Sequence, residues 1–387
     1  MKRLYVLKRI GVLLAFLLVL IAPGVAYAAG PWTMTVTVVG SGSVASTPAG
    51  IACPTDCTES YVDGTSVDLL ATPSAGWTFT SWAGSVCTGQ SPANPCTGIP
   101  MTNTRSITAT FTQTSGGTPP LVVVFMENHS WTQISGDPDM PWLNGFVAQG
   151  RRFTNYKEGS TTGPSLPDYL QMSAGSSCGK TTDSVTFSDA SITSAGCPTT
   201  VWNQLETAGK SWGVYAEGMP SVCYAQTPFN DSVTDGQYVL KHNPAPMYES
   251  IADNSALCNA HSLPFSSFST TSMRDVSFIA PNLCDDMHGQ SSGGGHANCV
   301  TNSNGLESRS DTWLSNNVQP IVDAGATVLV TFDEQGTLYA VVAGSGITAG
   351  STDGAAYTHY NLLAGIEDRF GLSRLNNAAG KTPLPLT

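Results

Sequence analysis

The sequence predicts an α/β sandwich with a largely parallel central sheet, preceded by a small all-β module. From residue 121 onward, continuous apolar runs alternate with helix-like stretches, as expected for strands buried on both faces. Residues 31–113 instead alternate polar and apolar residues, as in strands with one buried face. A Gly/Ser/Thr and Pro stretch at residues 114–120 forms a linker between the two patterns.

Composition excludes two classes of protein. Only 11% of the residues are charged and 41% are hydrophobic, so wholesale disorder is excluded. The formal net charge of −12 argues against a nucleic-acid partner, because phosphate contacts need clustered Lys and Arg. The length of 387 residues favours two domains.

Residues 1–28 have the pattern of a secretory signal peptide. Basic residues precede an apolar run at 10–21, and Ala26-Tyr27-Ala28 supplies small residues at a cleavage site. The alternative is an uncleaved membrane anchor, but the run is shorter than the ~20 residues of a spanning helix. We therefore expect a secreted or extracellular protein, with the periplasm or the cell surface also open.

All ten cysteines follow this signal, which favours disulfides in an oxidising compartment. Four lie in the first region and six in the second, so local pairing within each region is plausible, but the connectivity stays open. Metal binding by cysteine is less favoured, since no two cysteines have CxxC spacing.

The all-β module is predicted from strands at 33–39, 66–72 and 106–111, with a small core supplied by Trp77, Phe79 and Trp82. The order of its Gly, Cys and Trp residues, ending in Ile-Thr-Ala-Thr-Phe, resembles bacterial repeat modules related to the InlB B-repeat. This resemblance implies a small β module that is not catalytic. Such a module could contact glycans or a cell surface, or act as a spacer.

The second region is predicted to contain buried strands and amphipathic helices. The strands are expected at 121–125, 327–332 and 338–342, and the helices at 140–149, 200–208, 311–323 and 357–370. In a sheet of this kind, functional sites lie beyond the carboxyl ends of the strands.

Acidic residues follow two of these strands directly. Glu127 and Asn128 come after the first, and Asp333 and Glu334 after the second. They could be ordinary loop residues, or they could converge on a hard or borderline cation as oxygen ligands.

Ser165 begins a probable helix after a Gly/Ser/Thr loop. A serine in this position can be a helix cap, or a nucleophile placed where backbone N–H groups favour an anion.

Histidines in polar clusters are further candidates, namely His242, His288 and His359, and Asp285 lies close enough to His288 to share a ligand. The remaining histidines, His129, His261 and His296, are expected to be structural or solvated.

Together these segments resemble the phosphoesterase family that includes bacterial acid phosphatases and phospholipases C, a branch of the alkaline phosphatase superfamily. The resemblance spans about residues 119–375, within an expected catalytic domain at 121–387. It is carried, in the family's order, by residues 124–130, 164–169, 241–244, 280–288, 332–334 and 357–363 with 366–368.

The resemblance implies a role for each candidate residue. A divalent metal ion, of open identity and count, would be held by Glu127, Asn128, Asp333, Glu334 and Ser165. Ser165 would be the nucleophile, with His242, Asp168 and Asp285 in the substrate pocket and His288 and His359 in catalysis. In relatives with two metals, Asp285, His288 and His359 match ligands of the second. The three histidines would offset phosphate charge if protonated.

Two departures from the family pattern stand out. Asp168 replaces an Asn of many relatives, so we expect either a protonated Asp168 with an acid-shifted optimum or an extra cation nearby. Gly163 replaces a His that often precedes the Pro-Ser step, which removes one possible phosphate ligand.

The expected function is that of a secreted acid phosphatase acting on phosphate monoesters, small or lipid-linked, through a phosphoserine. A phospholipase C or other phosphodiesterase on the same site is the alternative. A third possibility is an inactive surface-binding protein.

Overall fold

The computed structural model describes residues 30–387, apart from 41, 74–76, 85–93, 114–117, 160–162, 184–191, 194–195, 227–228 and 292–294. The expected signal peptide, Cys87 and most of the expected linker lie outside the described residues.

The N-terminal region consists of two four-stranded sheets, so the prediction of an all-β region is confirmed. One sheet has the order β4-β1-β8-β6 and the other β3-β2-β5-β7. Their core includes Met34, Leu69, Trp82 and Phe111. The strands are β1 (Trp32–Val39), β2 (Gly42–Thr47), β3 (Ala52–Cys53), β4 (Thr58–Tyr61), β5 (Ser66–Pro73), β6 (Trp77–Ala83), β7 (Cys96–Pro100) and β8 (Arg105–Gln113).

The second region contains an eight-stranded sheet of order β15-β12-β16-β9-β17-β18-β10-β19. Its strands from β15 to β17 are parallel neighbours, while β18 is antiparallel to both β17 and β10, so the expected largely parallel sheet is confirmed. The strands are β9 (Leu121–Met126), β10 (Gly150–Phe153), β12 (Trp212–Ala216), β15 (Ser262–Pro264), β16 (Val276–Ala280), β17 (Thr327–Phe332), β18 (Ala340–Gly344) and β19 (Ser351–Asp353). Two small two-stranded sheets pair β11 (Tyr156–Lys157) with β20 (Tyr357–Thr358), and β13 (Phe229–Asp231) with β14 (Gly236–Tyr238).

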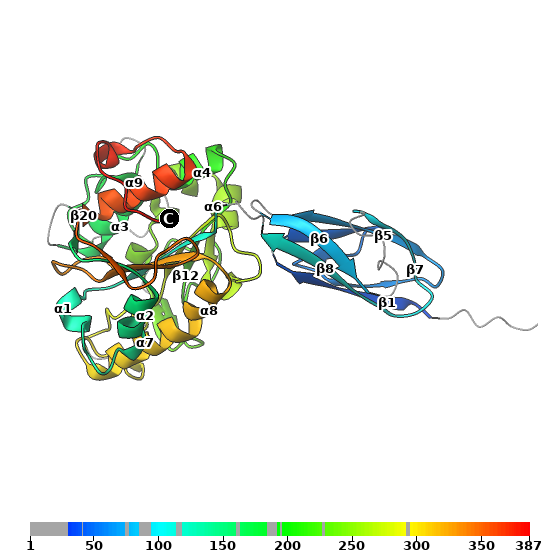
Figure 1. The fold of residues 1–387 in the computed structure, drawn as a ribbon, viewed down its shortest axis with the longest axis horizontal. Coiled ribbons are helices and arrows are strands. Elements are labelled where there is room, and N and C mark those ends of the chain that lie inside the picture. The colour runs from blue at the N-terminus through cyan, green and yellow to red at the C-terminus, as the bar shows by residue number, and fades with distance from the viewer. Residues whose placement is uncertain are drawn as a thin grey trace, which may run out of the picture.

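Helices lie on both faces of this sheet (Figure 1). One layer contains α3 (Ser165–Ala174), α4 (Val201–Thr207) and α9 (His359–Phe370), and the other contains α2 (Pro141–Gln149), α7 (Asn304–Asn317) and α8 (Gln319–Asp323). Shorter helices are α1 (Trp131–Ile134), α5 (Glu249–Ala252) and α6 (Ser255–His261). Two helices that flank the site have common end signals. α9 starts at a capping box formed by Thr358 and Asn361, and α3 ends at Gly175 in the left-handed conformation.

Two expected elements differ in their bounds. The helix expected at 311–323 is two helices, α7 and α8, because Pro320 at the start of α8 cannot continue the hydrogen bonding of α7. The strand expected at 338–342 begins at Ala340, since Leu338 pairs with Ser130 in an isolated bridge instead.

Cysteines pair locally within each region. Among the described residues the disulfides are Cys53–Cys57, Cys178–Cys197, Cys223–Cys258 and Cys284–Cys299. Within the same part of the chain, the helices are all too short or too polar to span a lipid bilayer.

Candidate active site

Ser165 is the first residue of α3, and its side chain is turned away from capping that helix. The N-cap is Pro164, in an extended conformation, and the Ser165 side chain makes no capping hydrogen bond. The Ser165 hydroxyl donates a hydrogen bond of 2.9 Å to Glu127 Oε2, and Lys241 Nζ lies 3.4 Å from the same hydroxyl oxygen. Ser165 therefore faces an acidic group and a cation in a buried setting, the arrangement that a nucleophile needs.

Two acidic strand ends lie side by side at the carboxyl edge of the sheet. β9 and β17 are parallel neighbours with Met126 opposite Phe332, so the next residues, Glu127 and Asp333, emerge together. Both side chains are fully buried. Asp333 Oδ1 accepts a hydrogen bond of 2.9 Å from the backbone N–H of Asn128. The register of two strands thus brings together carboxylates that are far apart in the sequence.

His242 links Glu127 to a third carboxylate, Asp286. Its Nδ1 lies 3.0 Å from Asp286 Oδ2, and its Nε2 lies 3.2 Å from Glu127 Oε1. The imidazole stacks on the ring of Tyr169, whose hydroxyl donates a hydrogen bond of 2.7 Å to Glu127. The other Asp286 oxygen accepts the backbone N–H of His288 at 2.7 Å. These contacts fix the orientation of the imidazole between two carboxylates.

The cluster contains more buried negative charge than its protein neighbours neutralise. Burial, followed by the charge of Asp333, raises the pKa of Glu127 well above its usual range, although Lys241 opposes the shift. Burial also raises the pKa of Asp286. Within the described part of the chain, Asp333 Oδ2 has no hydrogen-bond partner. Neither has His242 Nε2, whose 3.2 Å approach to Glu127 lacks the geometry of a hydrogen bond. Buried carboxylates without a partner are costly unless a cation joins them.

The donor set fits a divalent cation. Glu127, His242 and His288 each offer a ligand atom, and these atoms lie within 4.8 Å of one another. The orphaned oxygen of Asp333 adds a fourth possible ligand from the neighbouring strand end. A mixture of carboxylate and imidazole ligands suits zinc and other transition metals better than calcium.

Burial disfavours the protonated form of all three candidate histidines. Burial, with a smaller contribution from Lys241, lowers the pKa of both His242 and His288. Burial lowers the pKa of His359 to about 4. The expectation that protonated histidines offset phosphate charge therefore does not suit these surroundings, and Lys241 is the cation that the structure places beside Ser165.

The structure places Asp286, rather than Asp285, against His242. Asp285 turns the other way and makes two contacts with Arg309, from Nε at 2.7 Å and from Nη2 at 3.0 Å. It also accepts a hydrogen bond of 2.9 Å from the Asn282 amide. Both Asp285 oxygens are thus occupied by protein donors.

His359 contacts the backbone of Asp333. Its Nε2 lies 2.6 Å from the backbone carbonyl of Asp333, and its Nδ1 lies 2.9 Å from the Tyr156 hydroxyl. The side chain is fully buried. This placement favours a role in positioning Asp333, and a direct role of His359 in catalysis stays a prediction.

The remaining candidates lie at the edge of the cluster. Burial and then the charge of Asp333 raise the pKa of Asp168 to about 9, and its Oδ1 has no partner among the described residues. The same two influences raise the pKa of the half-buried Glu334 to about 7. Asn128 has the left-handed φ of 57°, which Asn tolerates better than most residues. The roles of Asp168, Glu334 and Asn128 in binding metal or substrate stay predictions.

Sequence reasoning missed three members of the cluster: Lys241, Asp183 and Asp286. Lys241 directly precedes His242, but a lone lysine beside a histidine is usually solvated, so its position gave no signal. Asp183 comes from a loop, and its Oδ1 accepts the backbone N–H of Leu166 at 3.0 Å. For Asp286 the signal was present in the Asp-Asp pair, but the sequence does not show which of the two side chains faces the site.

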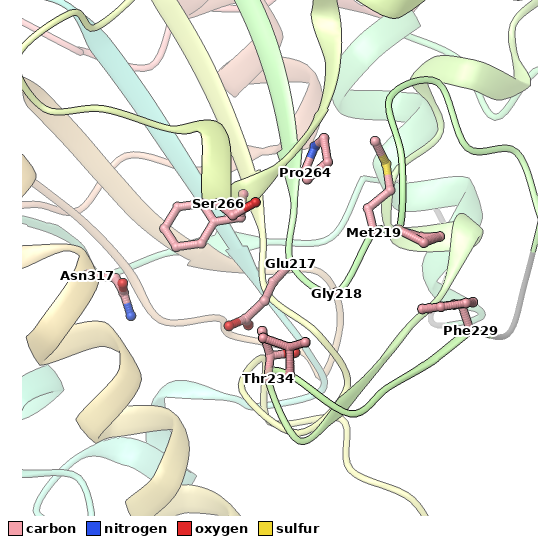
Figure 2. Close-up of a pocket in the computed structure, with 11 residues that line it drawn as sticks. Glu217, Gly218, Met219, Phe229, Thr234, Pro264, Ser266 and Asn317 are labelled. Atoms are coloured by element: carbon pink, nitrogen blue, oxygen red, sulfur yellow. The ribbon is translucent and has the colours of Figure 1, made fainter.

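A separate cavity of about 380 Å³ lies along the same edge of the sheet (Figure 2). It begins where β12 and β15 end. In the strand order these two strands lie two and three positions from β9. At a spacing of ~4.8 Å per strand, β12 is therefore roughly 10 Å from β9. Glu217 is the buried carboxylate at its wall, and most of the other lining residues are apolar: Met219, Pro220, Phe229, Val233, Pro264 and Phe265.

Comparison with known proteins identifies both regions. Residues 138–362 match the model of the "Phosphoesterase family", and residues 33–115 match that of the "Divergent InlB B-repeat domain". An acid phosphatase of Aspergillus fumigatus is 28% identical over 65% of this chain and 55% of its own length. A phosphatidylinositol-3-phosphatase of Mycobacterium tuberculosis is 25% identical over 68% of this chain and 81% of its own. The chain thus spans about half the length of the Aspergillus relative.

Solved structures with related folds are more distant. A protein in the alkaline phosphatase superfamily from Vibrio parahaemolyticus has a TM-score of 0.43 and 11% identity, over 69% of this chain and 71% of that chain. The family model, by contrast, covers more than half of this chain, including Ser165, His242, His288 and Asp333. The chain therefore belongs to the phosphoesterase family.

Proposed function

We propose that this protein is a secreted, metal-dependent acid phosphatase that hydrolyses phosphate monoesters through a phosphoserine intermediate. The observation that carries the proposal is the hydrogen bond of 2.9 Å from the Ser165 hydroxyl to Glu127, inside a buried cluster of carboxylates and neutral imidazoles. The matches to acid phosphatases support the choice of substrate class. The local disulfides support an extracellular location.

The residues that would hold the cation are Glu127, Asp333 and Ser165, with His242 as a nitrogen ligand, and His288 is kept as the base of the second step. When bound, a divalent cation supplies stabilisation of the serine alkoxide and of the phosphoryl oxygens. Asn128 and Glu334 remain further candidates at its edge.

The first step is a displacement at phosphorus by Ser165. Its hydroxyl proton passes to Glu127, to which it is already hydrogen-bonded. The bond between Oγ and phosphorus forms while the ester P–O bond breaks, and the leaving alkoxide takes up a proton from solvent. Lys241, 3.4 Å from Oγ, stabilises the negative charge on the phosphoryl oxygens.

The second step hydrolyses the phosphoserine. Water attacks phosphorus from the side that the alcohol has left, and neutral His288 accepts the proton of that water. The Ser165 oxygen leaves and recovers its proton from Glu127. His288 then returns its proton to solvent, so the net reaction is the hydrolysis of one ester bond.

The test compares p-nitrophenyl phosphate with its bis-ester from pH 4 to 9, using the purified protein, chelator-treated protein and Ser165→Ala. Metal-dependent turnover of the monoester, lost in the variant, is the expected result. If neither ester is hydrolysed after divalent metals are added back, phospholipid substrates are tested next. If these are not hydrolysed either, the phosphatase proposal is wrong, and an inactive surface-binding protein becomes the better interpretation.

A phosphodiesterase of the phospholipase C type is the second candidate, and the apolar cavity in Figure 2 favours it. A diester needs room for a second organic group beside the phosphate, and this cavity lies along the same edge of the sheet. Faster turnover of the bis-ester than of the monoester would support this candidate over the first.

A further inference from the structure

The Asp183 carboxylate contacts both the start of α3 and Lys241. Its Oδ1 accepts a hydrogen bond of 3.0 Å from the backbone N–H of Leu166, the residue after Ser165. Its Oδ2 accepts one of 2.9 Å from Lys241 Nζ. A backbone amide at a helix N-terminus and a lysine ammonium are both groups that proteins use to bind phosphate. One internal carboxylate thus occupies two phosphate-binding groups at once.

The same two donors lie close to the reacting atoms. Lys241 Nζ is 3.4 Å from Ser165 Oγ and 3.4 Å from His288 Nε2. A phosphorus atom poised for attack lies about 3 Å from the nucleophile, so its oxygens fall within reach of Lys241 and of the Leu166 amide. A phosphate and the Asp183 carboxylate cannot both use these donors, because two anions at this range repel each other.

We propose that Asp183 is an internal substitute for the substrate's phosphate group and sets how tightly the site holds phosphate. In the free protein it occupies the Leu166 amide and Lys241, and an incoming phosphate displaces it. This weakens the binding of the substrate and of the inorganic phosphate product alike. The inference rests on the proposed function, since it takes Ser165 as the nucleophile.

The surroundings of Asp183 permit such a displacement. Its side chain is 35% exposed, so it can move into water, whereas that of Lys241 is only 15% exposed and stays in the site. An asparagine at position 183 could still accept the Leu166 N–H through its amide oxygen. It would lose the charge that attracts Lys241. Asp183→Asn therefore removes the competition and keeps the contact at the start of the helix.

The experiment titrates inorganic phosphate into the wild-type protein, Asp183→Asn and a control, Asp275→Asn, by calorimetry. Asp275 also accepts a backbone N–H, from Ser211 at 2.8 Å, but it precedes β16 at the opposite edge of the sheet. We expect Asp183→Asn to bind phosphate about tenfold more tightly than the wild type, and Asp275→Asn to bind it equally. The KM for p-nitrophenyl phosphate should fall by a similar factor without a matching rise in kcat.

Lys241→Gln, alone and combined with Asp183→Asn, tests the same competition from the donor side. We expect Lys241→Gln to weaken phosphate binding, and the gain from Asp183→Asn to shrink in that background, because Asp183 has lost its main partner. Unchanged or weaker phosphate binding by Asp183→Asn overturns the inference, and so does the absence of phosphate binding in every protein. Phosphate binding needs no turnover, so a wild type that hydrolyses no ester refutes the proposed function separately.

Discussion

The hydroxyl of Ser165 and the carboxylate of Glu127 are joined by a hydrogen bond of 2.9 Å, although 38 positions separate them in the sequence. If Ser165 is the nucleophile, Ser165→Ala should lower kcat/KM for p-nitrophenyl phosphate by at least about 10³-fold, because the variant lacks the hydroxyl that lies between Glu127 and Lys241. Ser173→Ala, a serine of the same helix that bonds to the Tyr169 carbonyl instead, is the control and should retain activity. Equal losses in both variants would contradict the assignment.

Chelation should remove activity and also destabilise the protein. Without a cation, the buried carboxylates of Glu127, Asp286 and Asp333 repel one another. We expect chelator-treated protein to lose at least about 100-fold in turnover and to melt at a lower temperature, with both recovered on adding back a divalent metal. Glu127→Gln should reduce the metal content found by elemental analysis. A chelated protein with full activity would refute the metal site.

Asp168 should limit activity at alkaline pH. Its pKa of about 9 means that it is neutral at pH 7 and becomes negative as the pH rises, when it would repel a phosphate dianion. Asp168→Asn should therefore extend activity to higher pH. The idea fails if the pH–rate profiles of the variant and the wild type coincide.

The same group predicts the sign of a stability change. The folded protein holds a proton on Asp168 that the unfolded chain releases above its usual pKa near 4, so stability falls as the pH rises from about 4 to about 9. The contribution is at most about 1.4 kcal/mol per pH unit. Urea titrations of chelator-treated wild type and Asp168→Asn at several pH values should show a steeper fall in the wild type, because Glu127, Asp286 and Glu334, whose pKa values are also raised, contribute to the slope in both proteins.

Asp285 and Asp286 should respond differently to the same substitution. Asp286 touches His242, so Asp286→Asn should lower turnover by about 100-fold. Asp285 is bonded to Arg309, so Asp285→Asn should chiefly lower the free energy of unfolding, by about 1–3 kcal/mol. Activity measured at saturating substrate, together with thermal melts, separates the two effects. The reverse pattern would restore Asp285 as the residue of the substrate pocket.

The N-terminal sheets should be dispensable for turnover. They pack around a core of their own, and the α/β region has a separate one. A chain that starts at residue 118 should keep kcat/KM within about twofold of the full chain, because every residue of the candidate site lies after that point. Retention on cell-wall material or glycans, measured beside turnover, would show whether the removed sheets bind a surface. A large loss of turnover would show that they support the catalytic region.

The sequence predicts the central strands of the fold best where their surroundings are uniform. β9 is apolar along its whole length, and β17 is apolar apart from Thr327 and Thr331, because both faces are covered by helices, and this pattern is visible in the sequence. β12 and β16 lie between the same layers, but Gly213 and Ser277 interrupt their apolar runs, so they were not predicted. Burial on both faces depends on tertiary packing, and a short run that mixes polar and apolar residues does not reveal it.

The candidate site was predictable at its strand ends and less so elsewhere. Glu127 and Asp333 follow strands directly, so a parallel sheet places them at the same edge, and the pairing of β9 with β17 brings them together. Lys241 and Asp183 come from loops, and a loop's course depends on contacts that a single sequence does not display. Which of Asp285 and Asp286 faces the site depends on a shift of one position in a turn. The domain boundaries and the roles of the site residues stay predictions.

The pairing of β9 with β17 has a consequence for how the protein can be made. Ser165 and Glu127 are synthesised early, whereas Asp333 arrives only with the strand that completes the centre of the sheet. A product truncated before β17 would carry the serine and its acidic partner but would lack the second carboxylate and the strand that holds it beside the first. Such a fragment lacks one carboxylate of the proposed metal site, so we expect premature termination or proteolysis ahead of β17 to give an inactive product.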